Sequence, residues 1–128
     1  MIHITHTRHK GRLGESVACR YLSKRGFRVI LQNYQKKWGE IDIIAEKSEQ
    51  IHFFEVKSVT GDISRVTDCH RPEDNVHGLK LRHIGRMIET FMAERGLLGE
   101  PFQFHVLTVY LDMHNRRAQV FWFKNVIV

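Results

Sequence analysis

Cysteine is scarce in this chain, and the cysteines that occur have no metal-binding spacing. Among 128 residues only Cys19 and Cys69 are cysteines, which favours a reduced, cytoplasmic setting with structural or incidental thiols. No apolar run approaches the roughly 20 residues that a membrane span requires, and the N-terminal segment lacks the apolar centre of a signal peptide. We therefore expect a cytoplasmic protein with no membrane partner.

Motifs for two common kinds of catalysis are also missing. The chain has no Gly-rich phosphate loop and no Ser or Cys nucleophile motif. Histidine is more abundant, and His3, His6 and His9 recur every three residues. Because they stand in a polar N-terminal segment, a coincidental spacing or weak polycation character is favoured over a zinc site.

The composition is that of an ordinary globular protein with an excess of basic residues. With 42% hydrophobic and 27% charged residues the chain can form a core. We expect a flexible basic arm over residues 1–10 and a single domain over residues 11–128. The net charge of +6 favours a polyanionic partner, above all nucleic acid. Many basic domains bind no nucleic acid, so charge alone leaves this open.

Hydrophobic periodicity predicts two helices and five strands in the order α-β-β-β-α-β-β. Helices are expected from about Gly11 to Arg25 and from about Glu73 to Arg95, each with one apolar side. The other predicted segments are strands at about 27–34, 40–46, 51–58, 102–111 and 118–128, a basic turn at 35–37 and a polar loop at 59–74. A majority of strands with flanking helices indicates an α/β fold with a mixed sheet.

Acidic residues interrupt the two central predicted strands. Residues two apart in a strand share a face, so Glu40 lies on the same side as Asp42, and Glu55 on the same side as Lys57. A hairpin with a four-residue loop over 47–50 pairs positions whose numbers sum to 97, which puts Asp42 opposite Glu55. Two facing carboxylates repel each other, and a Mg²⁺ ion, which prefers oxygen ligands, would remove that objection.

Two interpretations of these acids stay open at this point. Glu-Val-Lys is a solvated strand face in most proteins. The alternative is a metal site, since phosphodiester cleavage requires a hard metal ion to activate water and a cation for the charge that develops in the transition state. Two acids and one lysine are the smallest set of side chains that would supply both functions, and Asp42, Glu55 and Lys57 form such a set.

Several motifs resemble those of a known family, over about residues 10–111. They are Gly14-Glu15 with Ala18 and Tyr21-Leu22, then Gly26, Asn33, GEIDIIA at 39–45, FEVK at 54–57, and Val76 with Lys80. This combination resembles the small bacterial YraN family. That family is similar in turn to the PD-(D/E)XK nuclease superfamily, whose restriction-endonuclease-like fold includes archaeal Holliday-junction resolvases.

The resemblance implies a role for each matching residue. Asp42 and Glu55 would bind Mg²⁺ or Mn²⁺, Lys57 would be the catalytic or phosphate-orienting lysine, and Glu15 would complete the metal shell. Gly14, at the centre of the first helix's apolar stripe, would allow that helix to approach the sheet closely. Without the resemblance, an ordinary acid on the helix surface near its N-terminus is the favoured interpretation of Glu15. Glu40 is either a further ligand or a neighbour of the ligands.

The chain also departs from the family pattern. Ile41 precedes Asp42 where the superfamily name implies proline. His105 stands where the family commonly has Asp, and Val59 where a basic residue is common. His105 is interpreted either as a hydrogen-bonded sheet histidine or as a residue that supports the ligands. The departures at His105 and Val59 leave the metal ligands in place but put full catalytic competence in question.

Scattered basic residues complete the expected site. Those expected to guide a phosphate backbone, without reading sequence, are Lys36, Lys37, Arg65, Arg71 and Lys80. The first functional hypothesis is a metal-dependent endonuclease acting on DNA, including branched or damaged DNA. The alternatives are a non-catalytic nucleic-acid-binding module of the same fold and, more weakly, a scaffold for repair factors. A homodimer is allowed by analogy with junction enzymes.

Overall fold

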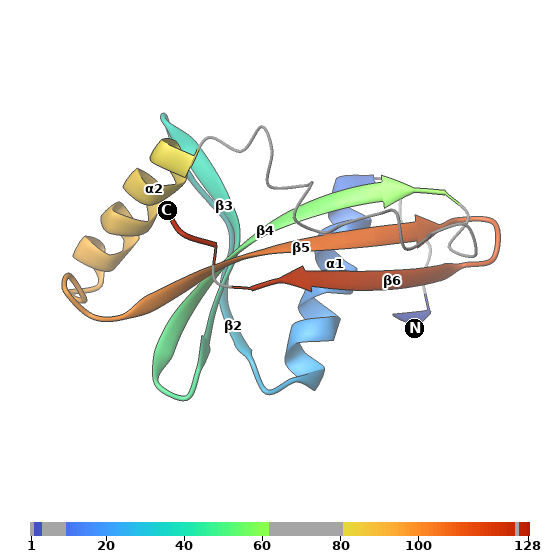
Figure 1. Ribbon diagram of the computed structural model, residues 1–128, viewed down its shortest axis with the longest axis horizontal. Helices are drawn as coiled ribbons and strands as arrows, with labels where there is room; N and C mark the ends of the chain where they lie inside the picture. Colours follow the sequence, from blue (N-terminus) through green and yellow to red (C-terminus); the bar gives the residue numbers. More distant parts are fainter. Residues whose placement is uncertain (1, 4–9, 62–80, 125) are drawn as a thin grey trace.

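The fold is a twisted mixed sheet with two helices. A computed structural model describes residues 2–3, 10–61, 81–124 and 126–128 (Figure 1). In chain order the elements are β1 (Ile2–His3), α1 (Lys10–Lys24), β2 (Arg28–Lys36), β3 (Gly39–Lys47), β4 (Gln50–Thr60), α2 (Leu81–Glu94), β5 (Phe102–Asp112) and β6 (Arg117–Phe123).

The six strands form one sheet in the order β1-β6-β5-β4-β3-β2. Strands β4 and β5 are parallel, and every other neighbouring pair is antiparallel. A parallel pair needs a crossover connection, and α2 lies in that connection. The predicted order of two helices and five strands is therefore confirmed from α1 onward, within an α/β fold.

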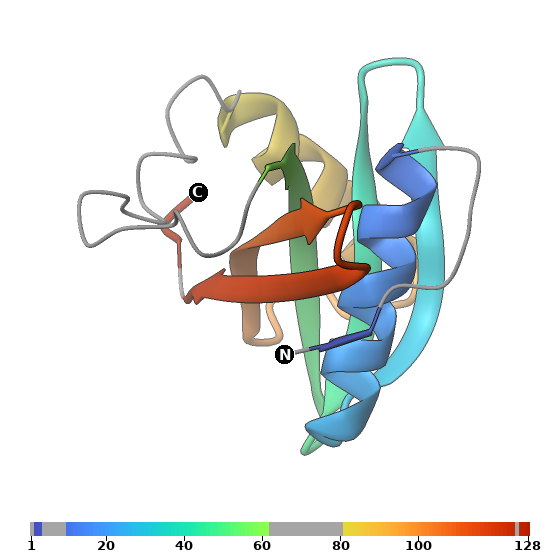
Figure 2. The same ribbon diagram turned by 90° about the vertical axis from the view of Figure 1, so that its right-hand side faces the viewer.

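The helices cover opposite faces of the sheet (Figure 2). Helix α1 buries Leu13, Val17, Ala18 and Leu22 in one core cluster, together with Phe54. Helix α2 contributes Ile84, Met87, Ile88, Phe91 and Met92 to a second cluster, together with Phe53. Since Phe53 and Phe54 are consecutive in β4, their opposite orientations follow from the alternation of side chains along a strand. The predicted apolar sides of both helices are confirmed.

Several predicted element ends are wrong. Strand β2 continues to Lys36, which pairs with Gly39, so residues 35 and 36 belong to the strand and not to a basic turn. Strand β6 ends at Phe123 and not at residue 128. Cross-strand pairing decides where a strand ends, and periodicity does not report it. The predicted second-helix start and most of the 59–74 loop lie outside the described residues.

Two further features were not predicted. Residues 2 and 3, expected in the arm, pair with β6 as a strand too short to show periodicity. The hairpin between β3 and β4 closes through a two-residue turn, because Lys47 pairs with Gln50. The turn residues Ser48 and Glu49 both have positive φ, 53° and 62°, as the tightest hairpin turns require. The predicted four-residue loop is therefore wrong.

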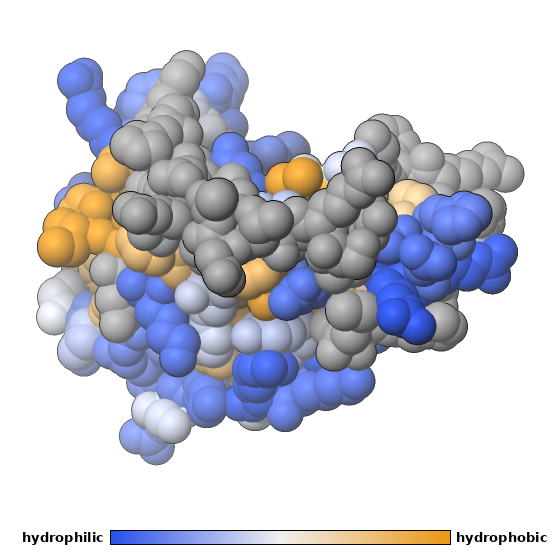
Figure 3. Space-filling model, turned by 45° about the vertical axis from the view of Figure 1, so that its right-hand side comes forward, coloured by the Kyte–Doolittle hydropathy of each residue, from blue (hydrophilic) through white to orange (hydrophobic). Residues whose placement is uncertain are grey.

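The exterior agrees with the charged composition. Figure 3 shows hydrophilic residues over much of the described surface on one face, with hydrophobic residues gathered at one side. Within the described part of the chain, no helix has both the length and the apolar character needed to cross a membrane.

Candidate functional site

Strands β3 and β4 stop pairing beside Asp42. Their register runs from Lys47 opposite Gln50 to Ile43 opposite Phe54, with numbers that sum to 97 as predicted. One residue further, the backbone amide of Val56 donates a hydrogen bond to the Asp42 carboxylate over 2.7 Å. Asp42 therefore lies where the strands separate, is only 6% exposed, and is held by its hydrogen bond to β4.

Glu55 lies next to Asp42, as the register predicts. The pKa of the Glu55 carboxyl is raised to about 9, first by burial and then by the charge of Asp42 and a hydrogen bond with it, while the charge of Lys57 opposes the increase. Burial disfavours a charged carboxylate, and a neighbouring carboxylate adds repulsion. Without a cation, Glu55 holds a proton at neutral pH.

Glu15 reaches the same carboxylate from helix α1. Burial is the first cause of its raised pKa, followed by the charge of Asp42 and a hydrogen bond with it, whereas a hydrogen bond with Asn33 lowers that pKa. Helix α1 and strands β3 and β4 thus bring Glu15, Asp42 and Glu55 together. We call these three residues the carboxylate cluster.

Close contact between α1 and β4 explains the reach of Glu15. A Cβ atom placed on Gly14 would lie 1.9 Å from the Ser58 Oγ and 3.1 Å from the Ser58 Cβ. A side chain at position 14 would have to displace the Ser58 side chain or push α1 away from the strand. The predicted role of Gly14 is confirmed, and Glu15, the next residue, is carried to the cluster by the same contact.

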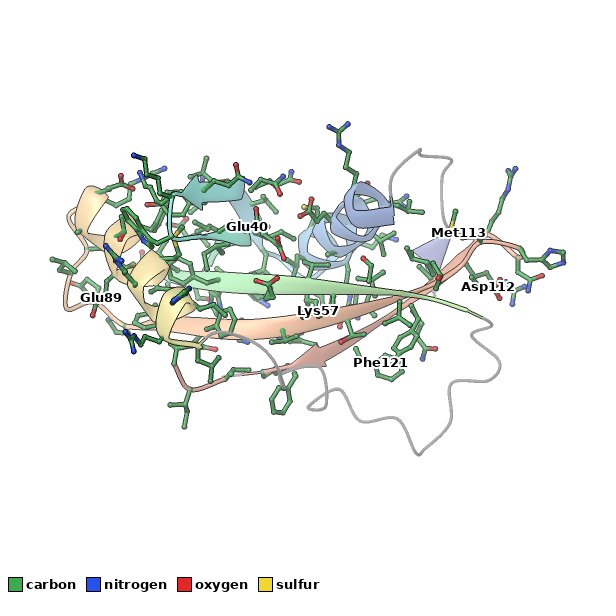
Figure 4. The ribbon with its side chains drawn as sticks, turned by 90° about the horizontal axis from the view of Figure 1, so that it is seen from above. Glu40, Lys57, Glu89, Asp112, Met113 and Phe121 are labelled. Atoms are coloured by element: carbon green, nitrogen blue, oxygen red, sulfur yellow. The ribbon has the colours of Figure 1, made fainter. Side chains whose placement is uncertain are left out.

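Lys57, Glu40 and Thr108 surround the cluster. In the view of Figure 4, Lys57 and Glu40 lie in the region between α2 and α1. Glu40 accepts a hydrogen bond from Gln35 over 2.8 Å, and its charge contributes to the raised pKa values of Glu15 and Glu55. Thr108 pairs with Lys57 in the parallel register, and its buried hydroxyl has no hydrogen-bond partner in the described part of the chain.

The carboxylate cluster has the donor chemistry for a hard divalent cation. Its ligands are oxygens and its excess charge is negative, as Mg²⁺ and Mn²⁺ sites require. Among the described residues, no three His, Cys, Asp or Glu side chains are already arranged to hold an ion together. In this state Asp42 is hydrogen-bonded separately to Glu15 and to Glu55. The type of donor therefore suits a hard divalent cation, whereas the present arrangement of the side chains does not yet form its site.

The expected nucleic-acid contacts are only partly described. Lys36 forms an ion pair with Glu94 of α2 over 2.9 Å. Lys37 is exposed in the turn between β2 and β3. Arg65, Arg71 and Lys80 lie outside the described residues.

His105 and Asn33 complete the surroundings. His105 is buried, and its Nε2 lies 3.0 Å from the Nδ1 of the buried His52, which agrees with its interpretation as a hydrogen-bonded sheet histidine. Asn33, which sequence reasoning assigned no role, hydrogen-bonds Glu15. Its φ of 54° is a conformation that Asn tolerates better than most residues, and the family resemblance, which includes Asn33, is the one signal in the sequence that singles it out.

Sequence comparisons with known proteins agree on one family. The model of the uncharacterised protein family UPF0102 matches residues 14–109. A UPF0102 protein of Moorella thermoacetica is 34% identical over 113 residues, 88% of this chain and 90% of the relative. A UPF0102 protein of Alkaliphilus metalliredigens is 38% identical over 106 residues, which cover 83% of this chain and 89% of the relative. A solved structure of Pyrococcus furiosus SfsA in complex with Ca²⁺ is similar with a TM-score of 0.39 and 13% identity, over 90% of this chain and 62% of that chain. The chain belongs to the uncharacterised protein family UPF0102.

Proposed function

We propose that the protein is a divalent-metal-dependent nuclease of the restriction-endonuclease-like, PD-(D/E)XK type, with DNA as its substrate. The observation that carries the proposal is the carboxylate cluster. Three acids from three different elements converge where β3 and β4 separate, although their mutual repulsion disfavours ionisation. Protein structures retain such strained groups chiefly at functional sites.

The cluster would hold Mg²⁺ or Mn²⁺ through Asp42, Glu55 and Glu15. When bound, the cation would polarise a phosphoryl oxygen and lower the pKa of a water molecule. Asp42 is already oriented by the Val56 amide, so it loses little side-chain freedom on binding. Glu55 must release the proton that its raised pKa retains, and the raised pKa of Glu15 opposes its ionisation in the same direction.

Lys57 would orient the phosphate and stabilise its developing negative charge. Its half-buried side chain starts from β4 two residues after Glu55, on the same face. The surrounding sheet is rigid, since Phe53, Phe54, Val106 and Leu107 beside this position are fully buried. A fixed ammonium group stabilises charge without reorganising during the reaction.

A substrate with phosphate groups agrees with the net charge of +6. The second candidate is a nucleic-acid-binding module without turnover. It is favoured by the lack, within the described ranges, of a preformed set of three ligands. Both candidates predict salt-dependent binding of DNA, and only the nuclease predicts cleavage.

Cleavage assays distinguish the two candidates. Linear duplex, single-stranded and four-way-junction DNA would be incubated with Mg²⁺ or Mn²⁺, and with EDTA as the metal-free control. We expect metal-dependent cleavage of at least one substrate, and a loss of roughly 100-fold or more in rate for Asp42→Asn and Lys57→Ala.

A matched control is available on the same hairpin. Glu46 also lies in β3 but is paired with Arg28 over 2.7 Å, away from the cluster. Glu46→Gln should cleave at the wild-type rate. Binding of all three DNA forms without cleavage would favour the binding module, and equal cleavage by wild type and Asp42→Asn would contradict the nuclease proposal.

A further inference from the structure

We propose that Arg86, stacked on Trp38, is a phosphate-binding position for the nucleic-acid backbone beside the carboxylate cluster. The ligand is a phosphodiester group, recognised without regard to base sequence. This inference rests on the proposed function for the identity of its ligand, a nucleic acid. It adds a contact surface, formed by Lys37, Trp38, Arg82 and Arg86, that spans the β2–β3 turn and α2. We call it the stacked-arginine surface.

Trp38 holds the guanidinium group of Arg86 in place. The Arg86 Cζ lies 4.3 Å from the centroid of the Trp38 ring. Trp38 itself packs against the core cluster of α2, so the indole is anchored from below. Stacking on an aromatic face leaves the edge of a guanidinium group free to donate hydrogen bonds. Arg86 is therefore preorganised, and binding a phosphate costs it less side-chain freedom than a mobile lysine would lose.

The charge of Arg86 is not neutralised by an acid in the described part of the chain. Glu46 is paired with Arg28 and Glu94 with Lys36, so neither of these acids is paired with Arg86. Lys36, although one of the predicted phosphate contacts, is thus engaged with Glu94. Arg86 is exposed, and its planar group suits the bidentate geometry of a phosphate.

Two more exposed cations stand beside Arg86. Arg82 lies one helical turn earlier in α2, and Lys37 lies in the turn next to Trp38. Like charges four residues apart on a helix repel each other, so Arg82 and Arg86 destabilise the unliganded helix. An anion bound between them would relieve that repulsion.

The stacked-arginine surface adjoins the carboxylate cluster. A Cβ atom placed on Gly39 would lie 3.3 Å from the Met87 Cγ, so the β2–β3 turn and α2 are in close contact at the residue after Arg86. Glu40 follows Gly39 and is electrostatically coupled to both Glu15 and Glu55. A phosphate held by Arg86 would thus belong to the same strand as one placed at the cluster.

Fluorescence anisotropy with a labelled DNA duplex tests this position. Binding would be measured in EDTA over a series of salt concentrations. For Arg86→Ala we expect affinity to fall about 5- to 10-fold at low salt, and the slope of log K against log[salt] to decrease by about 0.9. Arg86→Lys should retain the slope and lose part of the affinity, because it keeps the charge but not the planar group.

Arg25 provides a matched control. It is also exposed and stacked on an aromatic ring, with its Cζ 3.5 Å from the centroid of Tyr21. Arg25 stands before the start of β2, however, and Trp38 stands after its end, so the two stacked arginines lie at opposite ends of that strand. Arg25→Ala should leave both affinity and slope unchanged. Trp38→Leu should lower affinity at an unchanged slope, with circular dichroism to verify its folding.

The inference is overturned if Arg86→Ala binds like the wild type, if Arg25→Ala weakens binding as much, or if the wild type shows no salt-dependent binding. Glu46→Gln, whose side chain pairs with Arg28 away from the cluster, should bind DNA like the wild type in the same assay in EDTA. A protein that binds DNA through Arg86 but never cleaves it would contradict the proposed nuclease and support this inference. If Arg86→Ala changed neither cleavage nor binding, the result would support the proposed nuclease and contradict this inference.

Discussion

The backbone amide of Val56 donates a hydrogen bond to the carboxylate of Asp42, where β3 and β4 stop pairing. If β3 and β4 continued to pair, the Val56 amide would have a main-chain partner, and here the Asp42 side chain takes that place. The replacement satisfies the amide and fixes Asp42 between Glu15 on α1 and Glu55 on β4. The candidate site therefore exists because the strands separate at this residue.

Glu55→Gln should make the protein more stable at alkaline pH. The folded pKa of Glu55, about 9, lies above its unfolded value of 4.5. Between pH 4.5 and pH 9 the native state therefore binds more protons than the unfolded state. The stability that the protonated Glu55 contributes below pH 4.5 is lost as the pH rises towards 9. Glutamine cannot ionise, so urea unfolding at pH 8 should show a variant more stable than wild type by about 2 kcal/mol.

Glu46→Gln is the control for that measurement. Its partner Arg28 is exposed, and such surface pairs contribute only about 0–1 kcal/mol. Its stability should follow the wild-type pH profile. A wild type that grows more stable between pH 5 and pH 9, relative to Glu55→Gln, would contradict the assigned environment of Glu55.

Thr108→Val should also stabilise the metal-free protein. The Thr108 side chain is fully buried, and its hydroxyl is unpaired within the described residues. Replacing it by a methyl group of similar shape removes a desolvated polar atom, worth about 1 kcal/mol. Thermal unfolding measures the change, and a decrease in Tm would show that the hydroxyl has a partner.

Gly14→Ala should destabilise the protein, although alanine favours a helix more than glycine does. The added Cβ would meet Ser58, and the displacement should cost about 1 kcal/mol net. Ser58→Ala removes the nearest atom, so the same substitution in that background should cost less. A double-mutant cycle measures the coupling, and additive effects would mean that α1 and β4 are not in contact at this position.

His105→Gln should reduce the sensitivity of the fold to acid. Burial lowers the pKa of His105 to about 4, with the charges of His52 and Lys124 as further causes. Because the unfolded state binds more protons below the ordinary value of 6.5, stability falls as the pH falls from 6.5 to 4. His105→Gln should be less stable than the wild type at pH 7 by about 1–3 kcal/mol. It should, however, lose less stability than the wild type when the pH falls from 7 to 4.

The exposed His114 is the control for that comparison. His114→Gln should leave both the stability at pH 7 and its decrease on acidification unchanged. If His105→Gln and the wild type lose equal stability between pH 7 and pH 4, His105 is not held neutral by its surroundings.

Much of the candidate site could be predicted from the sequence because it depends on strand geometry. The alternation of side chains and one hairpin register bring Asp42 beside Glu55. The position of Gly14 in the helix stripe predicts the close approach that carries Glu15. These features follow from local periodicities, which a sequence displays directly.

Other features depend on contacts between distant segments. The separation of β3 from β4 leaves no pattern in the residues themselves, and Ser48 and Glu49 are unusual in a turn that requires positive φ. The stacking of Arg86 on Trp38 joins residues from two elements. Such contacts arise only when the chain is folded, so the corresponding residues carried no signal in the sequence.

Calorimetric titration of Mn²⁺ into the wild type, Asp42→Asn and Glu46→Gln tests most directly whether the carboxylate cluster binds a divalent cation. We expect binding by the wild type and Glu46→Gln, with proton release that reflects the raised pKa of Glu55, and loss of binding in Asp42→Asn. No binding to the wild type, or equal binding to Asp42→Asn, would contradict this expectation.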